Sequence, residues 1–166
     1  TDTAIYVIAR ASGEGKDRTA SKGDYYLTDD EEYNISLIRR RYAKVVVIIN
    51  GGGVIDTAFL KSQNVNSILV VSQLGNVGGH VVADVITGIS DPCGRLTDTW
   101  AKAYDDYPGK DDFSSNNGNT DDEFYKEGMY VGYRYFDSFG VEPAYPFGYG
   151  KSYTDFDIAV AETALD

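Results

Sequence analysis

Three short apolar runs lie in the first half of the chain, at residues 4–9, 44–50 and 67–71. Runs of this length with few polar interruptions predict β-strands that are buried on both faces of a sheet. Segments with a helical pattern separate and follow these runs. The alternation indicates βαβ units, which build a parallel sheet with right-handed crossovers.

Three segments are predicted to be helical. The first begins at residues 28–31, where Thr28 and Glu31 have the spacing of a capping box. Its apolar residues share roughly one predicted face: Tyr33, Leu37, Ile38 and Tyr42. The second helix is short, at residues 56–63, and the third covers residues 80–87.

The second half of the chain has a different character. Residues 104–123 are polar and rich in Asp, Asn, Ser and Gly, which predicts a long exposed loop. An aromatic segment follows at residues 125–136, and we expect its tyrosines to pack in the core rather than to line a sugar subsite. Residues 157–160 alternate like the first strand of a further element.

The loop after the first predicted strand contains a candidate catalytic group, Glu14, between two glycines in the sequence S-G-E-G-K-D-R. Functional groups of open α/β sheets gather beyond the carboxyl ends of the strands, and glycines let a ligand approach closely. Arg18, next to Asp17, either holds the loop in shape or tunes the acidity of Glu14. Taken alone, so short a motif also fits a polar turn without chemistry.

The composition of the chain argues against several classes of partner and of site. The chain has 166 residues and a formal net charge of −11, which disfavours nucleic acid and anionic membranes as partners. Its single histidine, His80, and single cysteine, Cys93, argue against a histidine metal site, a Ser-His-Asp triad and an intrachain disulfide, so we expect no metal and no cofactor. The sequence contains no membrane-span pattern and no signal-peptide pattern, and this leaves a cytoplasmic or a secreted location open.

Six short motifs occur in a fixed order along the chain. They are residues 12–15 with 17–18, 45–50 with the glycines 51–53, 78–80 with 83–85, 92–96 with 99–100, 127–136, and 146–150 with 152–154. Together they resemble the second domain of the family 3 glycoside hydrolases, the β-glucosidase-like enzymes, over residues 4–156.

The resemblance implies a specific chemistry. Members of this family combine a (β/α)8 barrel, which carries an aspartate nucleophile, with an α/β sandwich domain, which in many members lends a glutamate acid/base from a loop like S-G-E-G. Glu14 matches that glutamate, and the implied reaction is retaining hydrolysis of β-glycosides, with the two carboxyl groups about 5–5.5 Å apart. A general acid of this kind needs a raised pKa. Asp17 and Arg18 become candidates for substrate binding or for shaping the loop.

The same resemblance implies that the chain is only part of an enzyme. A (β/α)8 barrel needs about 250 residues of its own, so the nucleophile is expected outside this chain and the isolated fragment is expected to be inactive. We expect a three-layer α/β sandwich with a mostly parallel, flavodoxin-like sheet over residues 1–156, partial because its first strands are missing before Ala4. Residues 157–166 would then be a linker or the start of a β domain. We expect another segment or a second copy of the chain to cover the exposed edge of the sheet.

Two other functions stay open at this level. A flavodoxin-like module that binds a nucleotide or anion fits a parallel sheet, and a non-catalytic carbohydrate-binding or interaction module fits the tyrosine-rich second half. The glycines at 51–53 lack the spacing of a phosphate-binding loop, so we assign them a structural role. The chain departs from the family pattern at Asn76-Val77, where relatives tend to carry Gln-Glu, and at Cys93, where they tend to carry serine.

Overall fold

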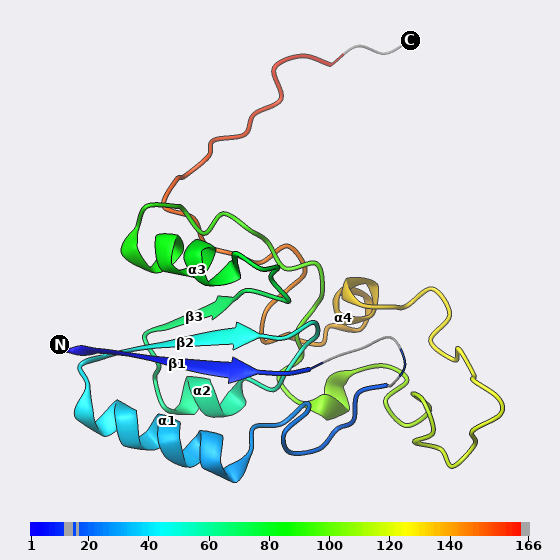
Figure 1. The fold of residues 1–166 in the computed structure, drawn as a ribbon. Coiled ribbons are helices and arrows are strands. Elements are labelled where there is room, and N and C mark those ends of the chain that lie inside the picture. The colour runs from blue at the N-terminus through cyan, green and yellow to red at the C-terminus, as the bar shows by residue number, and fades with distance from the viewer. Residues whose placement is uncertain (12–14, 16, 164–166) are drawn as a thin grey trace.

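The computed structural model describes residues 1–11, 15 and 17–163, and its sheet has three parallel strands. These strands are β1 (Thr3–Ala9), β2 (Lys44–Asn50) and β3 (Ser67–Val70), in the order β1-β2-β3. Ile5 lies opposite Val46 in the first pair, and Val47 lies opposite Ile68 in the second. In Figure 1, α3 lies on one side of the sheet and α1 and α2 on the other. The predicted α/β class with an open parallel sheet is therefore confirmed.

Helix α1 (Asp29–Arg41) begins at the predicted capping box. The Thr28 hydroxyl accepts a hydrogen bond from the Glu31 amide, and the Glu31 carboxylate accepts one from the Thr28 amide. The predicted apolar face is wrong in one respect, because Tyr33 is 66% exposed whereas Ile35 is fully buried. Ile35 shares a helical face with Ile38, three residues on, whereas Tyr33 lies about half a turn away.

The other helices are close to their predicted positions. Helix α2 (Ala58–Ser62) connects β2 to β3, and α3 (Gly78–Thr87) follows β3. Gly88 ends α3 in the left-handed region at a φ of 79°, a conformation that glycine adopts without strain. No residue of α3 is fully buried, and Val81 and Ile86 stay partly exposed. In the described chain α3 therefore covers its face of the sheet only loosely.

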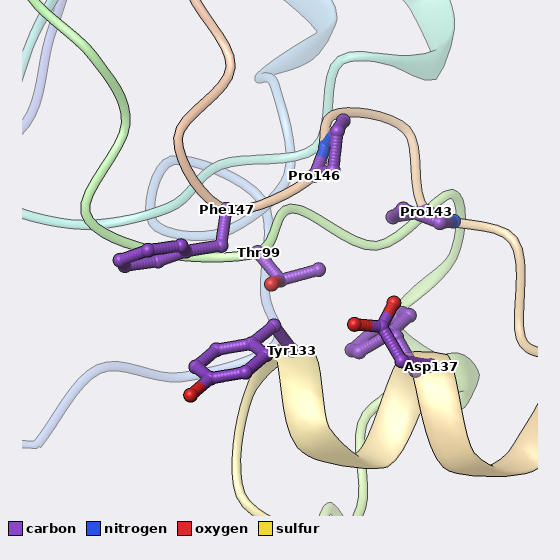
Figure 2. A pocket seen from close by; sticks show the side chains of 7 residues that line it. Thr99, Tyr133, Asp137, Pro143, Pro146 and Phe147 are labelled. Atoms are coloured by element: carbon purple, nitrogen blue, oxygen red, sulfur yellow. The ribbon is translucent and has the colours of Figure 1, made fainter. Parts of the chain in front are cut away.

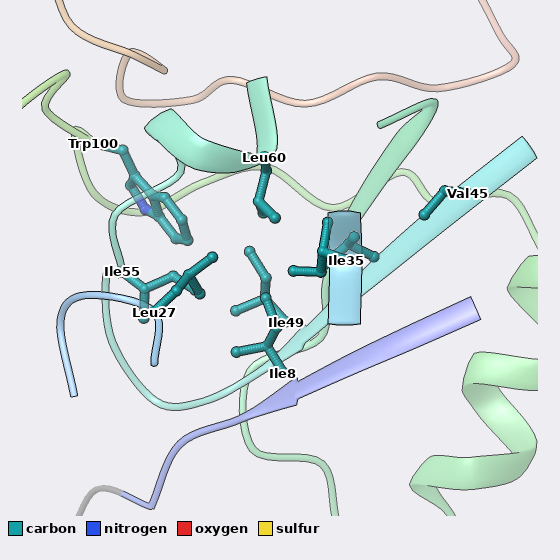
Figure 3. Packing of buried hydrophobic residues seen from close by; sticks show 9 residues of the cluster. Ile8, Leu27, Ile35, Val45, Ile49, Ile55, Leu60 and Trp100 are labelled. Carbon is teal, nitrogen blue, oxygen red and sulfur yellow. The ribbon is translucent and has the colours of Figure 1, made fainter. Parts of the chain in front are cut away.

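The hydrophobic core lies between the sheet and helices α1 and α2. Ile8 and Ile49 from the strands, Ile35 from α1 and Leu60 from α2 pack there around Leu27, Ile55 and Trp100, with Val45 farther along β2 (Figure 3). On the opposite face of β1, Val7 is 54% exposed and Ile5 is similarly exposed. The prediction that this strand is buried on both faces is thus wrong for β1, because it is an edge strand that α3 does not cover.

After β3 the described residues contain no further strand, only an isolated antiparallel bridge between Trp100 and Tyr145. The predicted long loop is confirmed, apart from the short 3₁₀ helix η1 (Tyr104–Asp106) within it. Helix α4 (Tyr133–Phe139) then begins inside the aromatic segment. The expectation that its tyrosines pack in the core is wrong: Phe136 is buried, but Tyr125 is 81% exposed and Tyr130 and Tyr133 are exposed too.

Residues 157–163 extend away from the body of the molecule without secondary structure (Figure 1). The assignment of this region as a linker or as the start of a β domain stays a prediction. Within the part of the chain that the structure describes, no helix combines the length and apolar character needed to span a membrane.

Candidate functional site

The candidate catalytic residue, Glu14, lies outside the described residues, as do Ser12, Gly13 and Lys16. Both flanks of its loop are described, and the loop leaves the carboxyl end of β1, which points toward the side of the molecule that holds α4 (Figure 1). Asp17 is exposed and makes no hydrogen bond with another described residue. The described part of this site therefore consists of the two ends of the loop.

At the first end, Arg10 follows β1 directly and is only 9% exposed. Its guanidinium donates to both carboxylate oxygens of Glu31, at 2.7 Å from Nη1 and 2.6 Å from Nη2. Nη1 also donates to the Ala9 oxygen and Nε to the Asp24 oxygen, each at 2.9 Å. A buried cation needs such a set of acceptors, so the first end of the loop is fixed to α1 and to the segment around Asp24.

The pKa of Glu31 reflects this arrangement. Burial by itself raises the pKa of a carboxyl group. The hydrogen bonds from Arg10 and from the Thr28 amide outweigh this burial and hold the pKa of Glu31 below its usual value. Glu31 is therefore ionised at neutral pH and compensates the charge of Arg10.

At the second end, Arg18 also uses its three guanidinium nitrogens on acceptors within the chain. Nε donates to the Asp24 carboxylate at 2.6 Å, Nη2 to the Asp24 backbone oxygen at 2.9 Å, and Nη1 to the Val54 oxygen at 2.6 Å. The Asp24 carboxylate also accepts from the amide and the hydroxyl of Thr19. Burial opposes ionisation of Asp24, but the Thr19 amide and Arg18 lower its pKa below the usual value.

The glycine run after β2 leaves space for these two arginines. A Cβ atom at Gly53 would lie 2.7 Å from Arg18 Nη1, and one at Gly51 would lie 3.1 Å from Arg10 Cβ. Any side chain at Gly53 would push the guanidinium away from the Val54 oxygen. This packing supports the structural role predicted for residues 51–53.

Sequence reasoning singled out Glu14, Asp17 and Arg18 but missed Arg10, Asp24 and Glu31. The ion pair of Arg10 joins residues that lie 21 positions apart, and no local pattern connects them. One signal was available: Arg10 directly follows an apolar strand, and an arginine that is buried at such a position requires a carboxylate partner.

A small cavity of about 130 Å³ lies beside α4 and is lined by Thr99, Tyr133, Phe136, Asp137, Pro143, Pro146 and Phe147 (Figure 2). The rings of Tyr133 and Phe147 are 5.2 Å apart on one side, and Asp137 lies across from them. The Thr99 hydroxyl is buried and has no hydrogen-bond partner among the described residues. The volume is similar to the roughly 150 Å³ that holds one benzene ring.

A larger cavity, of about 450 Å³, lies on the other side of α4 and has the size of a small-molecule site. It combines aromatic side chains, including Tyr130 and Phe139 with ring centroids 5.0 Å apart, with charged groups such as Glu127 and Lys110. Aromatic faces next to carboxylates suit contact with sugars, which present both C–H faces and hydroxyl groups. Among the described residues, no cluster of His, Cys, Asp and Glu has the arrangement of a metal site.

Comparison with known proteins gives consistent matches along the chain. A model of the glycosyl hydrolase family 3 C-terminal domain matches residues 1–133. A beta-glucosidase of Ruminococcus albus is 40% identical over all of this chain, which covers 17% of that protein, and beta-glucosidase A of Butyrivibrio fibrisolvens is 37% identical over 93% of the chain and 21% of its own length.

Solved structures of beta-glucosidases match the chain as well. Beta-glucosidase 3B from Thermotoga neapolitana in complex with glucose has a TM-score of 0.87 and 44% identity, over 93% of this chain and 22% of that one. A beta-glucosidase from Paenibacillus barengoltzii has a TM-score of 0.86 and 37% identity, over 93% of this chain and 17% of that one. The chain thus spans about a fifth of the length of the proteins that it matches.

Proposed function

Because the chain belongs to the C-terminal domain family of the family 3 glycosyl hydrolases, we propose that it is the α/β domain of a retaining, exo-acting β-glucosidase-like enzyme and supplies its general acid/base, Glu14. The observation that carries the proposal is the position of Glu14 in S-G-E-G, in the loop that leaves the carboxyl end of β1. Relatives and structural neighbours that are named as beta-glucosidases support it.

The proposed reaction has two steps. In the first, an aspartate of a barrel domain outside this chain attacks the anomeric carbon, and Glu14 protonates the oxygen of the bond that breaks, which releases the aglycone. In the second, Glu14 removes a proton from water as the water attacks the glycosyl-enzyme, and the sugar leaves with its original configuration. This chain supplies the proton transfers, and the partner domain supplies the nucleophile and the sugar contacts.

Asp17 is the exposed charged neighbour of Glu14 that has no partner among the described residues. A direct contact of Asp17 with substrate stays a prediction. Arg18 is committed to Asp24 and Val54, and its contribution to substrate binding stays a prediction too. The proposed division of labour also implies that the isolated chain does not hydrolyse glycosides. Cover of the exposed edge of β1 by a second copy or by another segment stays a prediction as well.

The test is kinetic and uses the full-length protein, because the proposed nucleophile lies outside this chain. The variant Glu14→Gln should lose about 100-fold or more of kcat/KM on a β-linked glucose disaccharide, which has a poor leaving group. It should retain much more of kcat/KM on 2,4-dinitrophenyl β-glucoside, whose leaving group needs no proton in the first step. Undiminished hydrolysis of the disaccharide by this variant would exclude Glu14 as the acid.

The larger cavity favours a second candidate function, non-catalytic binding of carbohydrate. Its exposed aromatic rings, Tyr130 and Phe139, give the supporting observation. Sugar binding that Tyr130→Ala abolishes, together with full catalytic activity of Glu14→Gln, would favour this function over the enzymatic one. The anion-binding alternative has less support, because the two arginines that lie against the glycines at 51–53 already donate to Glu31, Asp24 and the Val54 oxygen.

A further inference from the structure

We propose that Arg10, Arg18 and Asp24 form a clamp that sets the position of the Glu14 loop. Arg10 and Arg18 bracket the loop in sequence, and both donate a 2.9 Å hydrogen bond to one acceptor, the backbone oxygen of Asp24. The two ends of the loop are thereby held at one point. The inference rests on the proposed function of Glu14 and assigns these three residues a positioning role in the same reaction.

The clamp is attached to rigid parts of the fold. Arg10 reaches the first turn of α1 through its two hydrogen bonds to Glu31, which in turn caps the helix at Thr28. Arg18 reaches the segment after β2 through the Val54 oxygen. The amide of Arg10 also donates to the Asn50 oxygen, which extends the pairing of β1 with β2 by one residue. The loop therefore starts on backbone that helix and sheet hold in place, and it ends on contacts to the turn at Asp24 and to the segment after β2.

The charges of the clamp are balanced. Arg10 is paired with Glu31, and Arg18 with Asp24. The side chains of both pairs are mostly removed from solvent, so loss of one partner leaves a poorly hydrated charge without compensation. Such a charge moves toward water or toward another partner, and it takes its end of the loop with it.

Position matters for the proposed reaction because a proton passes between Glu14 and the departing oxygen only within hydrogen-bond reach. A shift of about 1 Å is enough to cost up to 100-fold in rate. In the first step this cost applies only where the leaving group needs the proton, and kcat/KM reports that step because it covers the reaction up to release of the aglycone. A loosened clamp should therefore lower kcat/KM for glycosides with poor leaving groups and spare kcat/KM for glycosides with good ones. A loss of folded protein would lower both equally.

The experiment compares Asp24→Asn and Arg18→Gln in the full-length protein. Asp24→Asn keeps the backbone oxygen but removes the charge that faces Arg18. For each variant, kcat and KM are measured on a β-linked glucose disaccharide and on 2,4-dinitrophenyl β-glucoside, with Glu14→Gln as the reference for loss of the acid. Lys22→Gln is the matched control. Lys22 lies two residues before Asp24, and its ion pair with Asp29 is exposed.

We expect both variants to lose about tenfold to 100-fold of kcat/KM on the disaccharide, and less than about threefold of kcat/KM on the activated substrate. The control should match the wild type on both. Arg18→Lys, which keeps the charge but cannot make the three-pronged contact, should fall between wild type and Arg18→Gln. Thermal unfolding of each variant identifies any loss of folded protein, and Arg18→Lys provides the test if Arg18→Gln does not fold.

Suppose that Glu14→Gln loses kcat/KM selectively on the disaccharide. Equal losses of kcat/KM on the two substrates for Asp24→Asn and Arg18→Gln, or no loss on either substrate, would then overturn the clamp. If Glu14→Gln itself shows no selectivity between the substrates, the proposed function fails, and the positioning role fails with it. The two failures are therefore distinguishable in one set of measurements.

Discussion

Arg10 and Glu31 form a two-point ion pair that joins the end of β1 to the first turn of α1, with N–O distances of 2.7 and 2.6 Å. Both side chains are largely buried, and the same carboxylate completes the cap of the helix. One interaction thus connects the sheet, the helix and the start of the loop that contains Glu14.

Removal of either partner should destabilise the fold. In Glu31→Gln the buried guanidinium of Arg10 loses its countercharge, so we expect the free energy of unfolding to fall by about 3 kcal/mol. Urea unfolding followed by circular dichroism measures the change. Lys102→Gln, which breaks the exposed pair with Glu142, should leave the unfolding curve unchanged. Equal effects of the two substitutions would contradict the structural importance of the Arg10 pair.

Stability should depend on pH through Glu31 and Asp24. Folding lowers the pKa of both carboxyl groups, so both favour the folded state where they are ionised. Their contribution is complete above the unfolded pKa values, about 4.3 for Glu and about 3.9 for Asp, and it is lost as the pH falls through the lower folded values. The free energy of unfolding, measured from pH 7 to pH 3, should therefore decline below about pH 5. The double variant Glu31→Gln/Asp24→Asn should show a shallower decline, and an unchanged slope would exclude these groups as its source.

Gly53 should not tolerate a side chain. In Gly53→Ala the new Cβ would meet Arg18 Nη1 at 2.7 Å, so the guanidinium must leave the Val54 oxygen. We expect a loss of about 1–3 kcal/mol in the free energy of unfolding. Gly79→Ala is the control, because nothing lies within 4 Å of a Cβ at that position in α3, and alanine there should stabilise the helix by about 0.5–1 kcal/mol. An unchanged free energy of unfolding in Gly53→Ala would show that the present position of Arg18 does not contribute to stability.

The two faces of β1 should respond differently to truncation. Ile8 is fully buried in the core, so Ile8→Ala should cost about 2–5 kcal/mol in the 166-residue chain. Ile5 points to the face that α3 leaves uncovered, and Ile5→Ala should cost less than about 1 kcal/mol. A similar cost at both positions would mean that a second copy or another segment covers this face in solution. Light scattering on the same samples separates these two cases.

Local sequence patterns were sufficient to predict the strands and the start of α1. The strands β1 to β3 are short apolar runs, and the cap of α1 involves residues only three positions apart. The clamp was not predictable in this way, because Arg10 meets Asp24 and Glu31 only after the sheet and α1 have packed. The tyrosines of residues 125–136 were misjudged for a related reason. Their composition resembles a core, but the core cluster forms from the sheet, α1 and α2 together with Leu27, Ile55 and Trp100, and it does not include them.

The most direct test of the central claim is product analysis of Glu14→Ala in the full-length protein with azide present. Azide needs no general base, so it can take the place of water in the second step. We predict that azide raises the rate on 2,4-dinitrophenyl β-glucoside and that NMR identifies the product as the β-glucosyl azide, with retained configuration. Release of glucose alone at the wild-type rate, or formation of the α-glucosyl azide, would contradict the assignment of Glu14 as the acid/base of a retaining glycosidase.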